Sequence, residues 1–518
     1  MKKFLCILIV LASVAGLAFA TPSAETGPKT LVYATTEKTT NLDPAEAYDF
    51  HTWEIFYNIY QGLLSYTPGT TDIVPGLAES YTINDAGDEY TFKLRKGLKF
   101  TDGTPFKADA VKWSIDRVMA LEGDPSWLVT DFVESVDVID DYTVKFNLNF
   151  PCAFFHTVVA TVPYYPVNPN VYPKDKVVWD PAEMAGGQLV GLGAYKVVSF
   201  KRDEEIVLET NPDYFGSKPN IDRIVIRYFA DATTMRLALE KGEVDLVYKS
   251  VNPSDIVDMS KNPDLKTYKL DSPQIRYFCF ETSESVFKDN RLRQAVAAAI
   301  NRQDILQKVY LGQNKPLYSM VPMGMIYHTD DFKTELGDGN ISKANSLLAQ
   351  AGYSASKPFE FELWYTPSHY GDPEVNMAEV LKAQFEKANM KVTIKSAEWA
   401  AYKEKWGNKE MPLYLLGWYP DYLDPDNYTA AFAGTAGSAG MGINFSNPEW
   451  DALFKKEQSN ADPNVRKAVF EELQKRWTVD VPTAPIWQGE LYVFTKPNID
   501  GVKIGPPLIF LYGELTME

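Results

Sequence analysis

A strand–helix–strand pattern in the middle of the chain sets the class of fold. Residues 224–229 predict a strand, and Asp231 is placed to cap a helix that runs to Lys241. Gly242 ends that helix, and residues 244–248 predict a second strand. The short return from helix to strand is typical of a right-handed βαβ unit in a mostly parallel sheet. The pattern therefore predicts an α/β protein.

The same alternation continues to the C-terminus and predicts more than one domain. With 518 residues the chain is longer than one hydrophobic core usually serves, so two or three domains are expected. Several α/β segments joined by β-rich ones suggest lobes with a cleft between them, where ligands bind most often. Helices are expected near residues 292–300, 344–351, 377–385 and 465–477, and strands near 359–364, 392–395, 413–416, 486 and 491–494.

A β-rich segment lies nearer the N-terminus. Apolar and polar residues alternate over residues 90–94 and again over 98–100, and Gly97 permits a turn between them. This arrangement predicts a β-hairpin. An amphipathic helix is expected at residues 111–119, followed by strands at 136–138 and 142–148.

The first twenty residues predict a cleaved signal peptide. Two lysines precede an almost wholly apolar run at residues 4–19, and Ala-Phe-Ala at 18–20 offers a small-x-small cleavage site. A retained anchor is the alternative, but this run is short for a spanning helix and residues 21–30 form a Pro/Gly/Ser-rich linker. Cys6 lies inside the apolar run, where it is badly placed for lipid attachment. We therefore predict a signal peptide at 1–20 and a soluble periplasmic protein.

Two further cysteines leave the redox state open. Cys152 and Cys279 both lie among aromatic residues, as buried free thiols often do. They could also pair in an oxidising compartment. The sequence does not decide between free thiols and a disulfide.

Charge and motifs disfavour several classes of function. Acidic residues outnumber basic ones by 69 to 51, a net charge of −18, which disfavours nucleic-acid binding. The four histidines are scattered singly, and no Cys-x-x-Cys or His-Glu-x-x-His motif occurs, so no metal ligands and no cofactor are predicted. No Gly-x-Ser-x-Gly motif or other nucleophile–base pair is visible. No catalytic residue is therefore predicted, and the protein is not expected to be an enzyme.

One loop gathers the side chains best suited to binding a ligand. The apolar strand at 413–416 leads into residues 417–428, Gly-Trp-Tyr-Pro-Asp-Tyr-Leu-Asp-Pro-Asp-Asn-Tyr. Ligands of open α/β sheets bind at such strand ends. Aromatic rings give contact area, and carboxylates bind ammonium groups. The candidate ligand-binding residues are Trp418, Tyr419, Asp421, Tyr422 and Asp426.

Ordered motifs along the chain carry a family resemblance. The longest is residues 90–105, Tyr-Thr-Phe-Lys-Leu-Arg-Lys-Gly-Leu-Lys-Phe-Thr-Asp-Gly-Thr-Pro. Further motifs are residues 42–44, 61–64, 75–80, 193–196, 211–216, 242–245 and 293–302. From about residue 31 to the C-terminus, the chain resembles family 5 extracellular solute-binding proteins, the peptide- and nickel-type receptors of ABC importers. It departs at Lys107, where the family prefers a helix-capping Thr or Ser.

The resemblance implies a fold and a division into domains. The fold would be that of a type II, cluster C periplasmic binding protein: α/β, two-lobed, with a hinge and an extra inserted α+β domain. Lobe 1 would hold domain I (31–60, 191–279 and 482–518) and the inserted domain II (61–190). Lobe 2 would be domain III (280–481).

The resemblance also implies a function. The protein would be a monomeric receptor that captures a peptide in the interlobe cleft and delivers it to the permease subunits of an ABC importer. In peptide-binding members, an acid matching Asp421 holds the peptide amino group, and an aromatic matching Trp418 lines a side-chain pocket. The arginine with which dipeptide-binding members hold the carboxylate is missing here, where the sequence reads Val375-Asn376.

That departure leaves two alternatives open: either longer peptides bind, with their carboxylate held elsewhere, or the ligand is not a peptide. Stacked Trp and Tyr rings also suit sugars, so an oligosaccharide receptor is the main alternative. A nickel or metal-chelate receptor is disfavoured by the scattered histidines. A secreted glycosidase would use Asp421 and Asp424 as its pair of acids.

Overall fold

The computed structural model describes residues 27–39, 41–249, 251–367, 369–371 and 373–518. The predicted signal peptide and most of the predicted linker at 21–30 lie outside these residues.

One 11-stranded sheet runs through the molecule. β1 is parallel to β10 and β11, and β14 is parallel to β15 and β16, whereas the other pairs are antiparallel. The sheet is thus mixed, not mostly parallel as predicted, because hairpins and long returning strands join it besides βαβ units. From edge to edge its strands are β15 (Met390–Ser396), β14 (Phe359–Tyr365), β16 (Leu413–Trp418), β12 (Lys266–Phe280), β17 (Thr483–Thr495), β11 (Leu246–Tyr248), β1 (Thr30–Thr35), β10 (Arg223–Tyr228), β9 (Glu205–Thr210) and β8 (Tyr195–Lys201), with β13 (Lys315–Pro316) beside β17.

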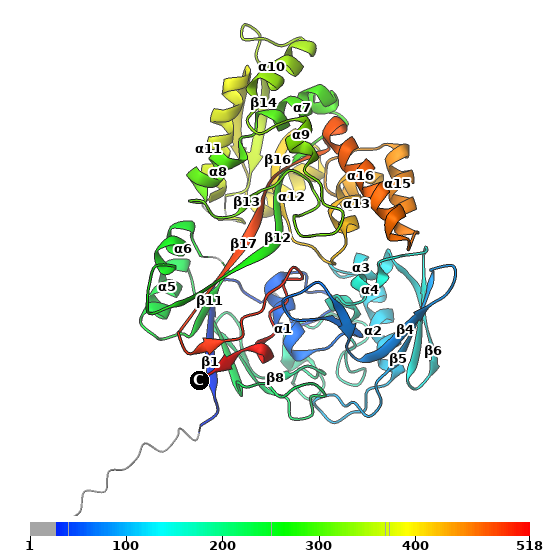
Figure 1. Cartoon of the computed structure of the whole chain (residues 1–518). Coiled ribbons are helices and arrows are strands. Elements are labelled where there is room, and N and C mark those ends of the chain that lie inside the picture. The colour runs from blue at the N-terminus through cyan, green and yellow to red at the C-terminus, as the bar shows by residue number, and fades with distance from the viewer. Residues whose placement is uncertain (1–26, 40, 250, 368, 372) are drawn as a thin grey trace, which may run out of the picture.

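Two long strands connect the two lobes. We call lobe 1 the part built on β1, β8–β11 and the small sheet described below, and lobe 2 the part built on β13–β16. The chain enters lobe 2 along β12 and returns along the antiparallel β17 (Figure 1). The pairing of β12 and β17 shifts register between Asp271 and Ile275, which marks a natural place for bending. β17 replaces the two separate strands predicted near residues 486 and 491–494.

The predicted strand–helix–strand unit is present in lobe 1. Helix α5 (Ala232–Glu240) joins β10 to β11, and both strands are parallel to β1, which lies between them. Asp231 caps the helix by accepting a hydrogen bond from Thr234 N at 2.9 Å. Gly242 has φ +76°, a conformation that only glycine adopts easily, so the chain can turn out of the helix there.

The remaining helices surround both lobes. The predicted helices of lobe 2 are confirmed as α7 (Asn290–Ala299), α10 (Ile341–Gln350), α11 (Pro373–Phe385) and α16 (Pro463–Asp480). Side-chain oxygens of Asp289, Asn340 and Asp462 cap α7, α10 and α16. Lobe 1 also holds α1 (Phe50–Ile59), α2 (Ala108–Leu121), α3 (Trp127–Thr130), α4 (Phe155–Val158) and α6 (Pro253–Met259). Lobe 2 holds α7 (Asn290–Ala299), α8 (Arg302–Val309), α9 (Asp331–Glu335), α10 (Ile341–Gln350), α11 (Pro373–Phe385), α12 (Trp399–Gly407), α13 (Ala430–Ala433), α14 (Thr435–Gly440), α15 (Pro448–Gln458) and α16 (Pro463–Asp480).

A four-stranded antiparallel sheet corrects the predicted hairpin. Its order is β4 (Ala78–Ile83), β5 (Glu89–Leu94), β7 (Thr143–Leu148) and β6 (Val133–Asp140). The hairpin prediction was wrong, because β5 is already paired on both edges, by β4 and β7. Residues 98–100 instead fold back on the following turn, with Lys99 bridged to Pro105. Two short pairs, β2 (Leu64–Tyr66) with β3 (Ile73–Pro75) and β18 (Ile499–Asp500) with β19 (Thr516–Met517), complete the strands.

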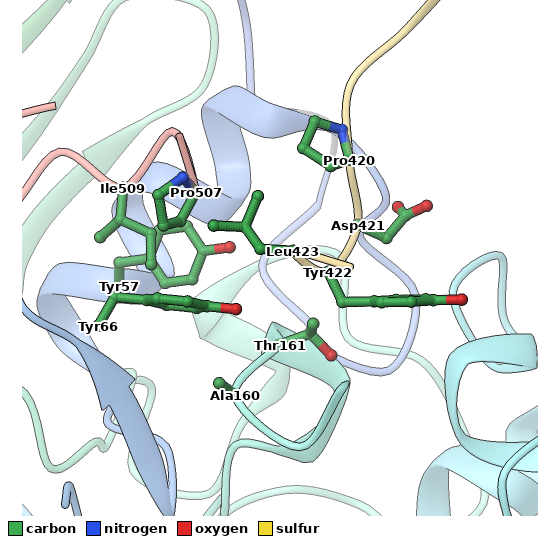
Figure 2. A pocket seen from close by; sticks show the side chains of 10 residues that line it. All are labelled: Tyr57, Tyr66, Ala160, Thr161, Pro420, Asp421, Tyr422, Leu423, Pro507 and Ile509. Atoms are coloured by element: carbon green, nitrogen blue, oxygen red, sulfur yellow. The ribbon is translucent and has the colours of Figure 1, made fainter. Parts of the chain in front are cut away.

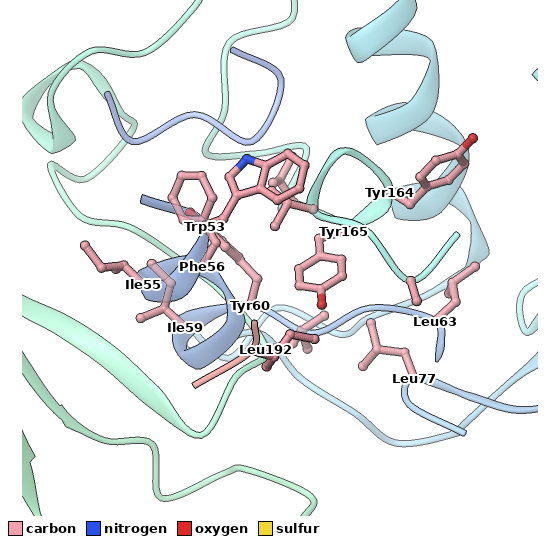
Figure 3. Packing of buried hydrophobic residues seen from close by; sticks show 14 of the residues in the cluster. Trp53, Ile55, Phe56, Ile59, Tyr60, Leu63, Leu77, Tyr164, Tyr165 and Leu192 are labelled. Carbon is pink, nitrogen blue, oxygen red and sulfur yellow. The ribbon is translucent and has the colours of Figure 1, made fainter. Parts of the chain in front are cut away.

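Each lobe has its own hydrophobic core. In lobe 1, Ile55, Phe56 and Ile59 of α1 lie in one buried cluster with Tyr165 and Leu192 (Figure 3). The chain beside Leu192 approaches the end of α1 so closely that a Cβ at Gly191 would lie 2.0 Å from the Ile59 carbonyl oxygen, so only glycine fits. The core of lobe 2 lies around β12, β14 and β16 and the helices that cover them.

The structure decides the question about the cysteines. Cys152 is buried in the core of lobe 1 and Cys279 in the core of lobe 2, and both are free thiols. Within the described ranges, no helix is long and apolar enough to span a membrane.

Candidate functional site

The loop singled out by the sequence follows β16 directly. We call residues 418–428 the binding loop; they include the 3-10 helix η5 (Pro425–Tyr428). Asn427 fixes the turn, because its Oδ1 accepts hydrogen bonds from Trp418 Nε1 at 2.9 Å and from Asp421 N at 3.1 Å. The positions of Trp418 and Asp421 are therefore set by the end of β16 and by Asn427 of the short helix η5.

The binding loop touches lobe 1 at several points. Three of these contacts are a hydrogen bond from Tyr48 Oη to Asp421 Oδ1 at 2.8 Å, the rings of Phe50 and Tyr419 at 4.8 Å, and the stacked rings of Phe154 and Tyr422 at 5.5 Å. Trp418 instead packs edge-on against Phe432 of α13 at 5.2 Å. The predicted residues Tyr419, Asp421 and Tyr422 thus meet lobe 1.

Asp421 is the most unusual group of the loop. Its side chain is only 8% exposed, and Oδ2 is buried and makes no hydrogen bond within the described part of the chain. Burial raises the pKa of Asp421 to about 7, although hydrogen bonds from Tyr48 and Asn427 act in the opposite direction. A cation placed beside Oδ2 would supply the missing partner.

A pocket lies beside Asp421 between the lobes. It combines aromatic and apolar side chains, and the loop residues Pro420, Asp421 and Leu423 form one wall (Figure 2). Opposite them are Tyr57, Tyr66, Ala160, Thr161, Pro507 and Ile509, which come from three distant parts of the sequence. The carboxylate of Asp421 points away from Tyr57 and Tyr66, so the pocket lies behind this acid and not at its oxygens (Figure 2).

Asp424 is held in a buried ion network. Arg466 of α16 donates to Asp424 Oδ2 at 2.8 Å and Oδ1 at 2.6 Å, and its Nη2 lies 2.7 Å from Glu457 Oε2. Burial raises the pKa of Asp424, and burial beside Asp426 and Asp424 raises that of Glu457 well above its usual range. Because both oxygens of Asp424 are occupied, the glycosidase alternative loses its second acid.

Tyr422 and Asp426 already have partners. Tyr422 Oη donates to Asp426 Oδ2 at 2.8 Å, and Gln458 Nε2 donates to Asp426 Oδ1 at 2.9 Å. Behind them, Ala153 N of lobe 1 donates to Gln458 O at 2.9 Å. These residues pack the two lobes together, whereas Asp421 keeps one oxygen that has no partner in the described part of the chain. Their assignment to ligand binding stays a prediction.

A buried charge cluster in lobe 1 was not predicted. Lys249, at the end of β11, lies 3.1 Å from Glu54 Oε2 and 3.4 Å from Glu37 Oε2. Burial raises the pKa of Glu37 despite the ammonium group of Lys249. Burial, together with Lys249, lowers the pKa of the nearby His51 to about 3. Two carboxylates thus share one cation on the lobe 1 side.

A second unpredicted cluster lies in lobe 2. Arg276 of β12 pairs through Nη2 with Glu374 of α11, and Tyr370 covers the guanidinium with its ring centroid 3.3 Å away. Both charged side chains are almost fully buried. One signal in the sequence marks both clusters: Lys249 and Arg276 are cations next to or within apolar strand patterns. The described residues hold no group of three metal-ligating side chains.

Comparison with known proteins places these features in a family. The sequence profile of the bacterial extracellular solute-binding proteins, family 5 (middle region), matches residues 72–440. The dipeptide-binding protein of Escherichia coli is 26% identical to this chain, covering 94% of each. The heme-binding protein A of Haemophilus influenzae is also 26% identical, covering 94% of this chain and 92% of its own length.

A solved structure shares the whole architecture. The ABC transporter-associated periplasmic binding protein DppA of Helicobacter pylori, in complex with the peptide STSA, is 25% identical and has a TM-score of 0.79. The alignment covers 94% of this chain and 98% of that one. This similarity confirms the two-lobed α/β binding-protein fold predicted from the sequence.

Proposed function

Because the chain belongs to the bacterial extracellular solute-binding proteins, family 5, we propose that it captures a peptide between its two lobes and delivers it to the permease of an ABC importer. The observation that carries the choice of a peptide is Asp421, whose Oδ2 is buried at the lobe contact and has no hydrogen-bond partner among the described residues. A buried carboxylate calls for an opposite charge, and the amino end of a peptide provides one. The dipeptide-binding and peptide-bound relatives support this choice.

The aromatic residues favour a peptide over an oligosaccharide. Sugars would need free ring faces, whereas Tyr419 packs on Phe50 and Tyr422 stacks on Phe154 with an angle of 10° between the rings. The pocket beside Asp421 is lined mainly by aromatic and apolar side chains, but in this structure it has room for no more than about one water, so the lobes must separate before a peptide side chain can enter it.

The other parts of the proposal concern location and chemistry. The protein is exported after cleavage of residues 1–20, acts in the periplasm as a monomer, and releases its ligand unchanged. The family and the relatives are binding proteins rather than enzymes, which supports this absence of turnover. We propose the domain boundaries at 60/61, 190/191, 279/280 and 481/482 as stated from the sequence.

An Asp421→Asn variant tests the amine anchor. The change keeps the size of the side chain but removes its charge, so it should weaken binding of peptides with a free amino end. Loss of one member of a desolvated ion pair costs about 2–5 kcal/mol, or roughly thirtyfold to several thousandfold in affinity. Calorimetry with alanine peptides of two to four residues would measure this loss.

Two controls sharpen that test. N-acetylated versions of the same peptides should bind equally to both proteins, because they have no ammonium group to lose. Tyr48→Phe removes only the hydrogen bond to Oδ1 and should cause a smaller loss. Equal losses for free and acetylated peptides, or no loss for either, would contradict the anchor role. Native mass spectrometry of ligand that co-purifies would separate a peptide from a hexose series.

A further inference from the structure

The Arg276–Glu374 pair leaves charge and hydrogen-bonding capacity unused. Arg276 is 1% exposed, and its Nη1 has no hydrogen-bond partner among the residues that the structure describes. Glu374 Oε1 is buried and likewise unpaired within them. A buried donor on a charged group is costly to leave unsatisfied. The pair is therefore incomplete without a further group.

The neighbouring residues restrict where Arg276 Nη1 can donate a hydrogen bond. Tyr370 covers one face of the guanidinium, and Glu374 occupies Nη2. Gly417 of β16 is the register partner of Arg276, and a Cβ there would lie 2.5 Å from Nη1. The neighbouring strand therefore makes room for the guanidinium at the residue that precedes the binding loop.

The position relates Arg276 to the amine anchor. Gly417 and Asp421 are four residues apart, and four residues span at most about 14 Å even when fully extended. The two charges thus lie at the same end of β16. The backbone of Gly417 is therefore no further from that of Asp421 than the length of an extended peptide of about four residues, and on this ground we expect short peptides to fit.

We propose that Arg276 binds the carboxylate end of the ligand, so that this receptor selects short peptides with both ends free. The inference rests on the proposed function. It assigns to a residue of β12 the binding of the peptide carboxylate, which Val375 and Asn376 cannot perform because neither side chain is charged. Guanidinium groups bind carboxylates through directed, charge-assisted hydrogen bonds. Lys249 is less suited to this role, because Glu37 and Glu54 already surround its ammonium group.

C-terminal amidation tests the proposal on the unaltered protein. Alanine peptides of two, three, four and six residues are compared as free acids and as amides, all with free amino ends. Amidation should lower the affinity for the two- to four-residue peptides at least roughly thirtyfold, because the carboxylate charge facing Nη1 is lost. The six-residue peptide should bind more weakly than the shorter ones in both forms.

Variants identify the residue responsible. Arg276→Met/Glu374→Met removes both charges, an exchange that buried pairs often tolerate, and it should abolish the preference for acids over amides. Arg276→Lys keeps the positive charge that pairs with Glu374 but loses the second directed donor, so the preference for acids over amides should decrease. This variant tests the proposal independently of whether the double variant folds. Arg236→Met, at a partly exposed ion pair in α5, is the matched control and should keep the preference.

The outcomes separate this inference from the proposed function. Equal affinity for acids and amides in the unaltered protein, with the amino end still required, would overturn the role of Arg276 and leave the peptide receptor standing. A preference that persists in both Arg276 variants would also overturn it. Failure to bind any peptide would overturn the proposed function and this inference together.

Discussion

At the scale of the residue, Asp421 couples ligand binding to protons. Its pKa of about 7 without ligand means that much of the carboxyl is protonated below neutral pH, because burial penalises the charge. A bound ammonium group favours the ionised form and lowers that pKa. Binding below pH 7 must therefore expel a proton from Asp421.

This coupling predicts a maximum of affinity near neutral pH. Affinity for a free peptide should rise from pH 5 to about 7 as Asp421 ionises, and fall above about 8 as the peptide amino group, with a pKa near 8, loses its proton. Calorimetry in buffers of different ionisation heat should detect proton release at pH 5–6 but none from Asp421 at pH 8. In Asp421→Asn the rise between pH 5 and 7 should disappear; its persistence would show that another group titrates.

At the scale of the element, α16 holds the binding loop through one cation. Arg466 neutralises Asp424 and Glu457, and all three side chains are buried. Arg466→Ala would leave two buried carboxylates without a counter-charge, which should cost about 3–5 kcal/mol of unfolding free energy. Denaturant unfolding followed by tryptophan fluorescence would measure the loss.

A neighbour in the same helix provides the control. Lys467 is 61% exposed, and its Nζ lies 3.8 Å from Glu471 Oε1. Lys467→Ala should change stability by less than about 1 kcal/mol, since exposed pairs contribute little. Similar losses in the two variants would mean that the Arg466 network contributes no more than a surface pair.

The positions of helices and strands were predictable from the sequence where neighbouring residues determine them, as at a helix cap or in an alternating strand. Asp231 and Gly242 marked both ends of α5, and the alternation in 90–94 marked β5. The pairing partners of β5 were not predictable, because β7 lies some fifty residues further along and the adjacent turn competed for it. The same limit applies to the site: the loop with Asp421 was visible as a motif, but Arg276 and Glu374 are 98 residues apart and meet only in the folded protein.

At the scale of the whole molecule, two lobes on a two-strand connection predict a hinge. In this structure the binding loop and α15 both touch lobe 1, through hydrogen bonds at Asp421 and at Gln458 respectively. We expect them to separate in solution without ligand and to close around a bound peptide, with bending where β12 shifts register.

Small-angle X-ray scattering measures this closure. The radius of gyration should decrease when a tight-binding peptide is added to saturation. At the same peptide concentration, the Asp421→Asn variant should keep the larger radius, because it binds the peptide more weakly. Its lobes should close only when the peptide concentration exceeds the variant's larger dissociation constant. An unchanged radius in the saturated, unaltered protein would contradict the hinge.

The way the sheet is threaded also sets the order in which the protein can form during synthesis. β11 is completed by β17, and α1 relies on the last residues: Tyr512 Oη donates to Glu54 Oε1 at 2.7 Å, and Asn58 binds the backbone of Phe510 and Tyr512. Lobe 1 thus begins at the N-terminus but stays unfinished until the final stretch has left the ribosome. Contacts so far apart in sequence form slowly. Under the export proposed above, this arrangement would give the chain time to cross the membrane unfolded, because its first half has no complete partner to fold against until its last residues arrive.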